Sequence, residues 1–274
     1  ALKQVWASRG WQARCLTPIS FLFFCLVRLR STLYKLGLLK TNTFSVPVIV
    51  VGNISVGGTG KTPMVISVIK KLKAAGYHPG IVSRGYGAMP AKEPRAVSYE
   101  TPAQLAGDEP LLLARDTQVP VCICADRSAA VQYLIDTNSV DVVVSDDGMQ
   151  HYAMHRDIEI AVIDGQRQLG NGWLMPAGPL REPPKRLHST NLIVLQQTAD
   201  TKAAARHFHL EIAAVRKLSN GSEVKLNDWR DKEIHAMAGL GNPQRFFNSV
   251  RAYAKTVHEH AMPDHHQYVS TDLD

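Results

Sequence analysis

Short apolar runs alternate with stretches of helical periodicity along most of the chain. The runs typical of buried strands are residues 46–51, 80–83, 119–125, 140–145, 158–163, 192–195 and 234–238. The helical stretches between the earlier runs are residues 61–75, 110–116 and 126–136, the last with Asp126 as its N-cap. Strands that alternate with helices indicate a mostly parallel sheet flanked by helices, so we predict an α/β fold.

The same pattern divides the chain into three parts. Residues 1–42 form an N-terminal region with one amphipathic helix, and residues 43–219 hold the alternating strands and helices. From about Asn220 the spacing loosens into the polar stretch NGSEVKLNDWRDKE. We therefore predict a second, smaller lobe over residues 220–274.

The N-terminal region contains an apolar run at residues 19–27, followed by Arg28, Arg30, Lys35 and Lys40. This nine-residue run, which is apolar except for Ser20, is too short to cross a hydrocarbon core, which needs about 20 residues. An amphipathic helix with basic residues can instead lie on an anionic membrane surface. A helix docked on the rest of the protein is the alternative. A signal peptide does not fit, because the segment has no small-residue cleavage site and its basic residues follow the apolar run instead of preceding it.

Composition narrows the class of protein. A hydrophobic share of 45% supports a real core, and 4 cysteines are too few for a disulfide scaffold. The net charge of +7 favours an anionic partner, which on charge alone could be a nucleotide, a nucleic acid, a lipid surface or a phosphorylated metabolite. We expect the cysteines to be reduced and mostly buried, as in a cytoplasmic protein.

The strongest chemical signal is the segment VPVIVVGNISVGGTGKTPMVISVIKKL. A buried strand, a glycine-rich turn and Lys-Thr at the start of a helix are typical of a P-loop NTPase-like site, whose backbone N–H groups surround phosphates. Lys61 would face the β- and γ-phosphates, and the Thr62 hydroxyl would reach Mg²⁺. The usual first glycine of the motif is replaced here by Ser55. The alternative is a tight turn with an incidental lysine.

Acidic residues follow two of the predicted elements. Asp146 and Asp147 end the apolar run 140–145 at the carboxyl edge of the sheet, where a carboxylate can hold a metal or its water. A simple Asp-Gly turn is the alternative. Asp108 and Glu109 of GDEP begin a helical stretch, and one of them could orient or deprotonate an acceptor hydroxyl. The histidines near residue 260 match no zinc-ligand spacing.

Six motifs in sequence order resemble the tetraacyldisaccharide 4′-kinase family of lipid A biosynthesis. They are GNISVGGTGKTP, SRGYG, GDEP, DDGMQHY, VIDG followed by GNGWLMPAGPLREP, and PDHHQY. The resemblance runs from the N-terminal helix to about Tyr268. It implies a membrane-associated enzyme that transfers the γ-phosphate of ATP, with Mg²⁺, to the 4′-hydroxyl of an acylated glucosamine disaccharide 1-phosphate.

The resemblance also implies roles for individual residues. ATP phosphates would bind to Ser55, Val56, Gly57, Gly58, Thr59, Gly60, Lys61 and Thr62. Catalytic roles would fall to Asp108 as base, His265 as its partner, Lys61, Asp146, His151 and Arg181. The metal would be held by Thr62, Glu109 and Asp147. The lipid would face Arg84 and Tyr86. His266 is adjacent and leaves the choice of histidine open.

The resemblance places the enzyme on the cytoplasmic face of the inner membrane as a peripheral or monotopic protein, with no obligate protein partner evident. Members continue with a TEKD-type segment that is not found here, so we expect the second lobe to be incomplete at its C-terminus.

The main alternative is a membrane-associated regulatory P-loop ATPase of the partition or cell-division type. Those proteins carry a lysine before the paired glycines, where this chain has Val56. A GTP-dependent switch would need an N-K-x-D element, which the sequence lacks. Nucleic-acid binding is not expected, because aromatic residues make up only 7% of the chain and are not interleaved with the basic ones.

Overall fold

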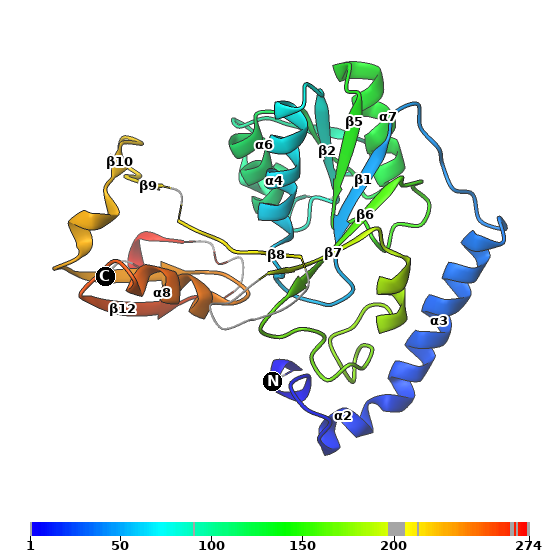
Figure 1. The fold of residues 1–274 in the computed structure, drawn as a ribbon, viewed down its shortest axis with the longest axis horizontal. Helices are drawn as coiled ribbons and strands as arrows, with labels where there is room; N and C mark the ends of the chain where they lie inside the picture. The colour runs from blue at the N-terminus through cyan, green and yellow to red at the C-terminus, as the bar shows by residue number, and fades with distance from the viewer. Residues whose placement is uncertain are drawn as a thin grey trace. The chain divides into compact units, whose positions relative to one another are not determined.

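The computed structural model describes residues 2–89, 91–196, 206–212, 214–263, 266 and 268–272. The chain forms two compact units, Ala1–Phe208 and His209–Asp274 (Figure 1). The first unit thus ends earlier than the boundary at residues 219 and 220 that the sequence suggested.

Among the described residues of the first unit, eight strands form a central sheet in the order β3-β4-β2-β5-β1-β6-β7-β8. Its strands are β1 (Val48–Gly52), β2 (Pro79–Ser83), β3 (Arg95–Val97), β4 (Val121–Ile123), β5 (Val142–Asp146), β6 (Ile158–Asp164), β7 (Leu192–Gln196) and β8 (His207–Phe208). All neighbouring pairs are parallel except β3 with β4, so the prediction of a mostly parallel sheet is confirmed.

Helices precede the sheet and connect its strands. They are α1 (Leu2–Val5), α2 (Trp11–Cys15), α3 (Thr17–Lys35), α4 (Lys61–Ala74), α5 (Ala103–Ala106), α6 (Asp108–Thr117), α7 (Arg127–Asn138) and the 3₁₀ helix η1 (Pro184–Ser189). The Asp126 side chain accepts a hydrogen bond from the Ser128 N–H, which confirms Asp126 as the N-cap of α7.

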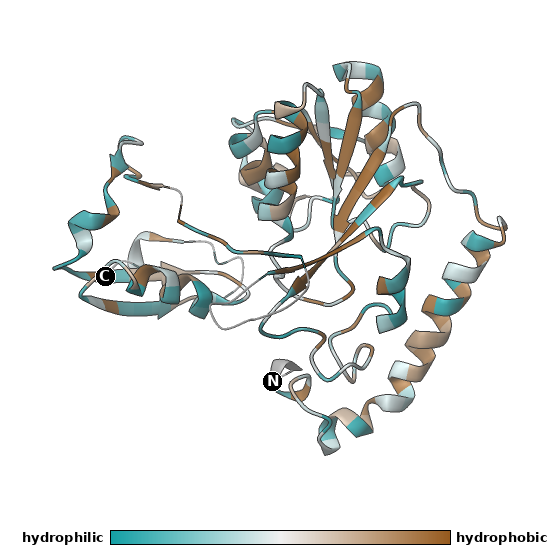
Figure 2. Cartoon of the chain, in the orientation of Figure 1, coloured by the Kyte–Doolittle hydropathy of each residue, from teal (hydrophilic) through white to brown (hydrophobic). Residues whose placement is uncertain are grey.

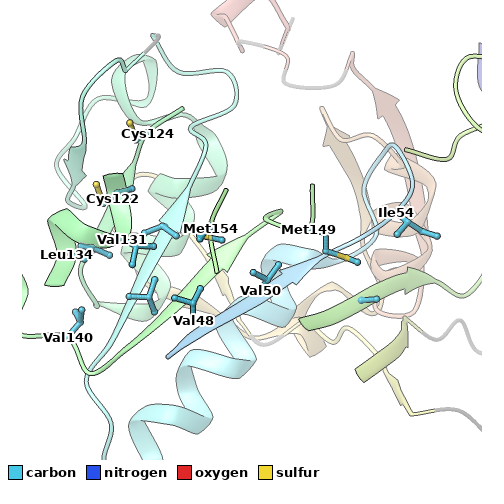
Figure 3. Packing of buried hydrophobic residues seen from close by; sticks show 14 of the residues in the cluster. Val48, Val50, Ile54, Cys122, Cys124, Val131, Leu134, Val140, Met149 and Met154 are labelled. Carbon is cyan, nitrogen blue, oxygen red and sulfur yellow. The ribbon is translucent and has the colours of Figure 1, made fainter. Parts of the chain in front are cut away.

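The sheet is buried on both faces, because alternate residues of its strands enter two separate cores. On one face, Ile49, Val51 and Val144 belong to a cluster with α4 and α6. On the other, Val48 and Val50 pack in a cluster with α7, with Met149 and with Met154 (Figure 3). The apolar strands with helices on both sides are visible in Figure 2. This burial explains why the strands read as continuous apolar runs.

The N-terminal region packs on the segment that precedes η1. Ser20 of α3 is buried, donates to the Leu174 carbonyl at 2.9 Å and accepts from the Ala177 N–H at 2.9 Å. The Trp6 indole donates to the Pro176 carbonyl at 2.9 Å. Within the described part of the chain, every helix is too short or too polar to cross a membrane.

The described residues of the second unit form two small sheets. Its elements are β9 (Val215–Arg216), β10 (Glu223–Val224), η2 (Leu226–Trp229), β11 (Glu233–Ala238), α8 (Pro243–Arg251), β12 (Thr256–Ala261) and η3 (Ser270–Asp272). Strands β11 and β12 are parallel, and β9 and β10 are antiparallel. A core of Ala236, Ala238, Phe247 and Val250 joins α8 to the parallel pair.

The expectation of mostly buried cysteines holds for only half of them. Cys122 and Cys124 are buried, but Cys15 and Cys25 are exposed, and all four are free thiols. Cys25 is exposed because it belongs to the outward side of α3. An apolar sequence context did not distinguish a core strand from an exposed helix face.

We predict that Leu134→Ala lowers the free energy of unfolding by about 2–5 kcal/mol, because it removes a buried α7 side chain and leaves a cavity. Leu134 is 1% exposed, whereas Leu112 of α6 is 45% exposed. Leu112→Ala is therefore the matched control and should cost well under half as much. Urea denaturation measures both; equal losses would contradict the assignment of this core.

Candidate active site

The glycine-rich loop joins β1 to α4, and Lys61 is the first residue of that helix. The loop is held from one side by the segment 179–181. The Val56 N–H donates to the Pro179 carbonyl at 2.8 Å. The Arg181 N–H donates to the Ile54 carbonyl at 2.7 Å. The loop therefore has a fixed base, and Arg181 is placed beside it by backbone pairing rather than by its side chain alone.

Two carboxylates lie at the end of β5, next to the loop. Strands β1 and β5 are neighbours, with Val51 in register with Asp146. The next residue, Asp147, has a left-handed backbone (φ 50°) and donates its N–H to the Val51 carbonyl at 2.8 Å. Aspartate tolerates this conformation better than most residues, and such departures concentrate at functional sites. The Asp147-Gly148 turn of the alternative interpretation is therefore present, and it is also what positions the Asp147 carboxylate in the candidate site.

Cations surround the Asp147 carboxylate. The Arg181 Nη1 atom lies 2.9 Å from Oδ2, and the Lys61 Nζ atom lies 3.8 Å from Oδ1. Burial by itself raises the pKa of Asp147, but Lys61 and Arg181 outweigh it and hold the pKa below its ordinary value. Asp147 is therefore ionised at neutral pH and positions both cations.

Asp146 is in a different environment. It is 1% exposed, and neither of its carboxylate oxygens has a hydrogen-bond partner. Burial raises its pKa to about 7, and the charge of Glu109 adds to this, while Lys61 opposes it. Glu109 belongs to the GDEP motif, so the charge of this motif acts on Asp146. A buried carboxylate with both oxygens unsatisfied is costly unless a cation joins it.

These donors fit a hard cation such as Mg²⁺. Magnesium is usually bound by one or two carboxylates together with substrate phosphates and water, rather than by a cage of protein ligands. Among the described residues, no group of three or more His, Cys, Asp or Glu side chains could hold a metal on its own. The orphaned oxygens of Asp146 supply the observation that favours a cation here.

The motifs GDEP and SRGYG lie against each other. Gly107 has φ 81°, and a Cβ atom there would lie only 2.6 Å from the Tyr86 carbonyl oxygen, so the close approach requires glycine. Asp108 and Tyr86 are both exposed. Burial lowers the pKa of Arg127, and the charge of Arg84 adds to this shift. Helix α6 begins at Asp108, earlier than the sequence predicted.

His151 is a neutral group in this structure. Its Nε2 atom lies 3.5 Å from Asp126 Oδ1, but burial and then the charge of Arg127 lower its pKa to about 4. At neutral pH the His151 ring is therefore uncharged. It can donate a hydrogen bond to a phosphoryl oxygen, but it supplies no positive charge.

The sequence did not single out Arg127, which is 7% exposed and follows the N-cap of α7. It donates to the Asp147 carbonyl at 2.9 Å, and its buried Nε atom has no hydrogen-bond partner. The position directly after an N-cap gives no sign of chemistry. Only the fold brings this third cation to the acidic pair.

Gln150 and Glu182 also went unassigned, although they lie within quoted motifs. The Gln150 amide donates to Glu182 Oε2 at 2.9 Å and to the Asn53 carbonyl at 3.0 Å, and its oxygen accepts from Arg181 at 3.3 Å. Glu182 is 2% exposed and also accepts from the Tyr152 hydroxyl. This network ties the base of the loop to Arg181.

His265 lies outside the described residues. Its neighbour His266 is bonded within the second unit, where its Nε2 atom lies 2.9 Å from Asp272 Oδ2. Tyr268 accepts from the Gly239 N–H at 2.7 Å through its hydroxyl. The described part of PDHHQY therefore packs against the end of β11, and the assignment of His265 stays a prediction.

Comparison with known proteins identifies the family. Residues 12–274 match the family model described as LpxK: Tetraacyldisaccharide-1-P 4′-kinase. The chain belongs to this family. It is similar to the tetraacyldisaccharide 4′-kinase of Halorhodospira halophila, with 47% identity over 98% of this chain and 80% of the relative. The relative from Azoarcus sp. is 45% identical, with the same coverage of both chains.

A solved structure agrees with the family assignment. A crystal structure of LpxK from Aquifex aeolicus in complex with ATP superposes with a TM-score of 0.78 and 32% identity, covering 94% of this chain and 84% of that one. Membership in the tetraacyldisaccharide 4′-kinase family makes the chain an ATP-dependent kinase of lipid A biosynthesis. It does not favour a regulatory ATPase of the partition type.

The buried Asp146 carboxyl predicts a pH dependence of stability. Its pKa is about 7 in the folded state against an ordinary value of 3.8, so the folded state binds more protons between these values. Stability from this group is fully present below about pH 4 and is lost as the pH rises to about 7. Asp146→Asn should remove that loss. We expect the stability difference, variant minus wild type, to grow from pH 5 to pH 7.5 in nucleotide-free protein with EDTA, measured by urea denaturation; a constant difference would contradict the assignment.

Proposed function

We propose that the loop of residues 55–62 binds the ATP phosphates and that the two carboxylates at the end of β5 complete the phosphoryl-transfer site. The observation that carries the proposal is the buried, unsatisfied Asp146 carboxylate near Lys61 and the glycine-rich loop. The Lys61 Nζ atom lies 3.8 Å from Asp147 Oδ1. When ATP binds, Lys61 would move from Asp147 to contact the β- and γ-phosphates. Arg181 would stay with Asp147 and face the transferring group.

The side chains that would hold Mg²⁺ are the Thr62 hydroxyl, Asp146, and Glu109 and Asp147 directly or through water. When bound, Mg²⁺ would neutralise charge on the phosphates. The ion pair of Asp147 with Arg181 at 2.9 Å engages one of its oxygens, whereas both Asp146 oxygens are unpaired. Asp146 is therefore better suited to contact Mg²⁺ directly. Asp147 is better placed to orient Lys61 and Arg181.

The acceptor would be the 4′-hydroxyl of a tetraacyldisaccharide 1-phosphate. Asp108, exposed at the start of α6, would take the hydroxyl proton with His265 as its partner, and the oxygen would then attack the γ-phosphorus as ADP leaves. Arg84 and Tyr86 lie in the loop packed against Gly107 and would contact the lipid. His151 would donate a hydrogen bond to the phosphoryl group.

The outer side of α3 supports a place on the cytoplasmic face of the inner membrane. Ser20 marks the docked side, and Leu22, Leu26 and Leu29 on the opposite side are each more than half exposed. At 100° per residue, Arg28 and Arg30 fall on the two edges of that apolar side. An apolar strip bordered by bases fits the boundary between acyl chains and anionic headgroups.

The docking of α3 relates this membrane surface to the site. Ser20 bonds to Leu174 and Ala177, and the same chain segment continues to residues 179–181, which pair with the phosphate loop. The segment 174–181 therefore supports both the phosphate loop and the helix that would contact the membrane. This arrangement would hold the phosphate loop close to an acceptor that is embedded in the membrane.

We predict that phosphate transfer to a tetraacyldisaccharide 1-phosphate in detergent falls at least about 100-fold in Lys61→Ala and in Asp108→Ala, because the first removes charge from the phosphates and the second the base. Transfer of radiolabelled γ-phosphate measures both. Asp116→Asn, on the exposed side of the same helix as Asp108, is the control and should retain wild-type activity. An active Asp108→Ala would exclude Asp108 as the base.

We also predict that the double variant Arg28→Glu and Lys35→Glu no longer binds anionic vesicles, because both charges on one edge of α3 reverse while Arg30 keeps its contacts with Tyr34 and Tyr152. Flotation with phosphatidylglycerol-rich vesicles measures binding. The control is Lys70→Glu with Lys71→Glu, which reverses the same number of charges on exposed positions of α4. If the two double variants float equally, α3 is not the membrane surface.

A further inference from the structure

The turn after β6 brings an arginine to the phosphate loop. Asp164 ends β6 and is 1% exposed. Its Oδ1 atom accepts from the backbone N–H groups of Gln166 and Arg167 at 2.9 and 3.0 Å. Its Oδ2 atom accepts from Arg167 Nε at 3.1 Å. The arginine is thus fixed at its backbone and at its guanidinium by one buried carboxylate.

The same guanidinium contacts the tip of the loop through its Nη2 atom, which also lies 3.1 Å from Asp164 Oδ2. Arg167 Nη2 donates to the Gly58 carbonyl. Gly57 has φ 104°, and a Cβ atom there would lie 3.1 Å from Arg167 Nη1. Arg167 therefore covers the backbone of both glycines. The other hydrogen bonds described above tie down the base of the loop, at Val56 and at Ile54.

The bond to Gly58 has a consequence for anion binding. In a trans peptide the carbonyl of one residue and the N–H of the next point in opposite directions. A guanidinium that holds the Gly58 carbonyl on one side turns the Thr59 N–H to the other side. A phosphate cradle needs such N–H groups to be oriented together before the ligand arrives.

We propose that Arg167 is a positioning residue that fixes the peptide plane between Gly58 and Thr59 so that the Thr59 N–H faces the triphosphate of ATP. Arginine suits this role because its planar fork binds the Asp164 carboxylate and the Gly58 carbonyl at once. A lysine at the same position keeps the charge but cannot hold both acceptors in fixed directions. This inference rests on the proposed function of the loop as the ATP phosphate site.

The test compares Arg167→Gln and Arg167→Lys in the full chain. We expect both to weaken ADP binding about tenfold by isothermal titration calorimetry, and to raise the KM for ATP by a similar factor. The kcat at saturating ATP should change less than threefold, because the bound loop regains its shape. The thermal midpoint of Arg167→Gln should fall, because the buried Asp164 carboxylate loses this cation and keeps the N–H groups of residues 166 and 167, whereas Arg167→Lys keeps a positive charge there and should fall less. Arg216→Gln, at an exposed position of the second unit, is the matched control.

The lysine variant decides between orientation and charge. If Arg167→Lys binds ADP as wild type does, the guanidinium does not fix the peptide plane and the proposal is wrong. A loss in kcat with an unchanged KM would overturn it as well. Lys61→Ala tests the loop itself: if it abolishes ADP binding while both Arg167 variants bind normally, only the role of Arg167 fails. If Lys61→Ala also binds normally, the proposed phosphate site fails.

Discussion

Two adjacent carboxylates at the end of a buried strand need cations, and this requirement organises the first unit. Burying an unpaired carboxylate is costly, so Asp146 and Asp147 must be compensated. Lys61, Arg127 and Arg181 come from the start of α4, the start of α7 and the segment before η1. Arg181 bonds to one oxygen of Asp147, whereas neither oxygen of Asp146 has a hydrogen-bond partner. We propose that a further cation completes the compensation when nucleotide binds.

Backbone pairing places these groups with little dependence on the side chains themselves. The register of β1 with β5 sets Val51 beside Asp146, and the bonds from residues 54 and 56 to residues 179–181 bring Arg181 to the loop. The same segment carries the contacts of Ser20 in α3. One connecting segment thus supports the loop, a cation of the site and the membrane helix that we propose.

Most of the sheet could be predicted from sequence, because strands buried on both faces are continuous apolar runs with few alternatives. The motif around Lys61 and the acids at 146 and 147 were recognisable because glycines before Lys-Thr and paired acids after an apolar strand are chemically unusual. Short elements such as β3 and β12 were missed, since their residues are half-exposed or charged and carry no apolar run.

Residues that act through the fold left no local signal. Arg127 follows an ordinary N-cap, and Arg167 follows an ordinary turn, so only coordinates show that both reach the phosphate loop or its acids. The sequence also did not predict that Asp146 and Asp147 have different environments. The left-handed backbone of Asp147 turns its side chain away from that of Asp146, and nothing in the sequence indicates this conformation.

The account is tested most directly by the dependence of ADP affinity on Mg²⁺ in wild type and in Asp146→Asn, measured by calorimetry with and without EDTA. Mg²⁺ should strengthen ADP binding to wild type. In Asp146→Asn that gain should disappear, while affinity without Mg²⁺ should be equal or higher, because a negative charge beside the phosphates has been removed. If Mg²⁺ raises ADP affinity equally in both proteins, Asp146 does not bind the cation that accompanies the nucleotide, and the account is contradicted.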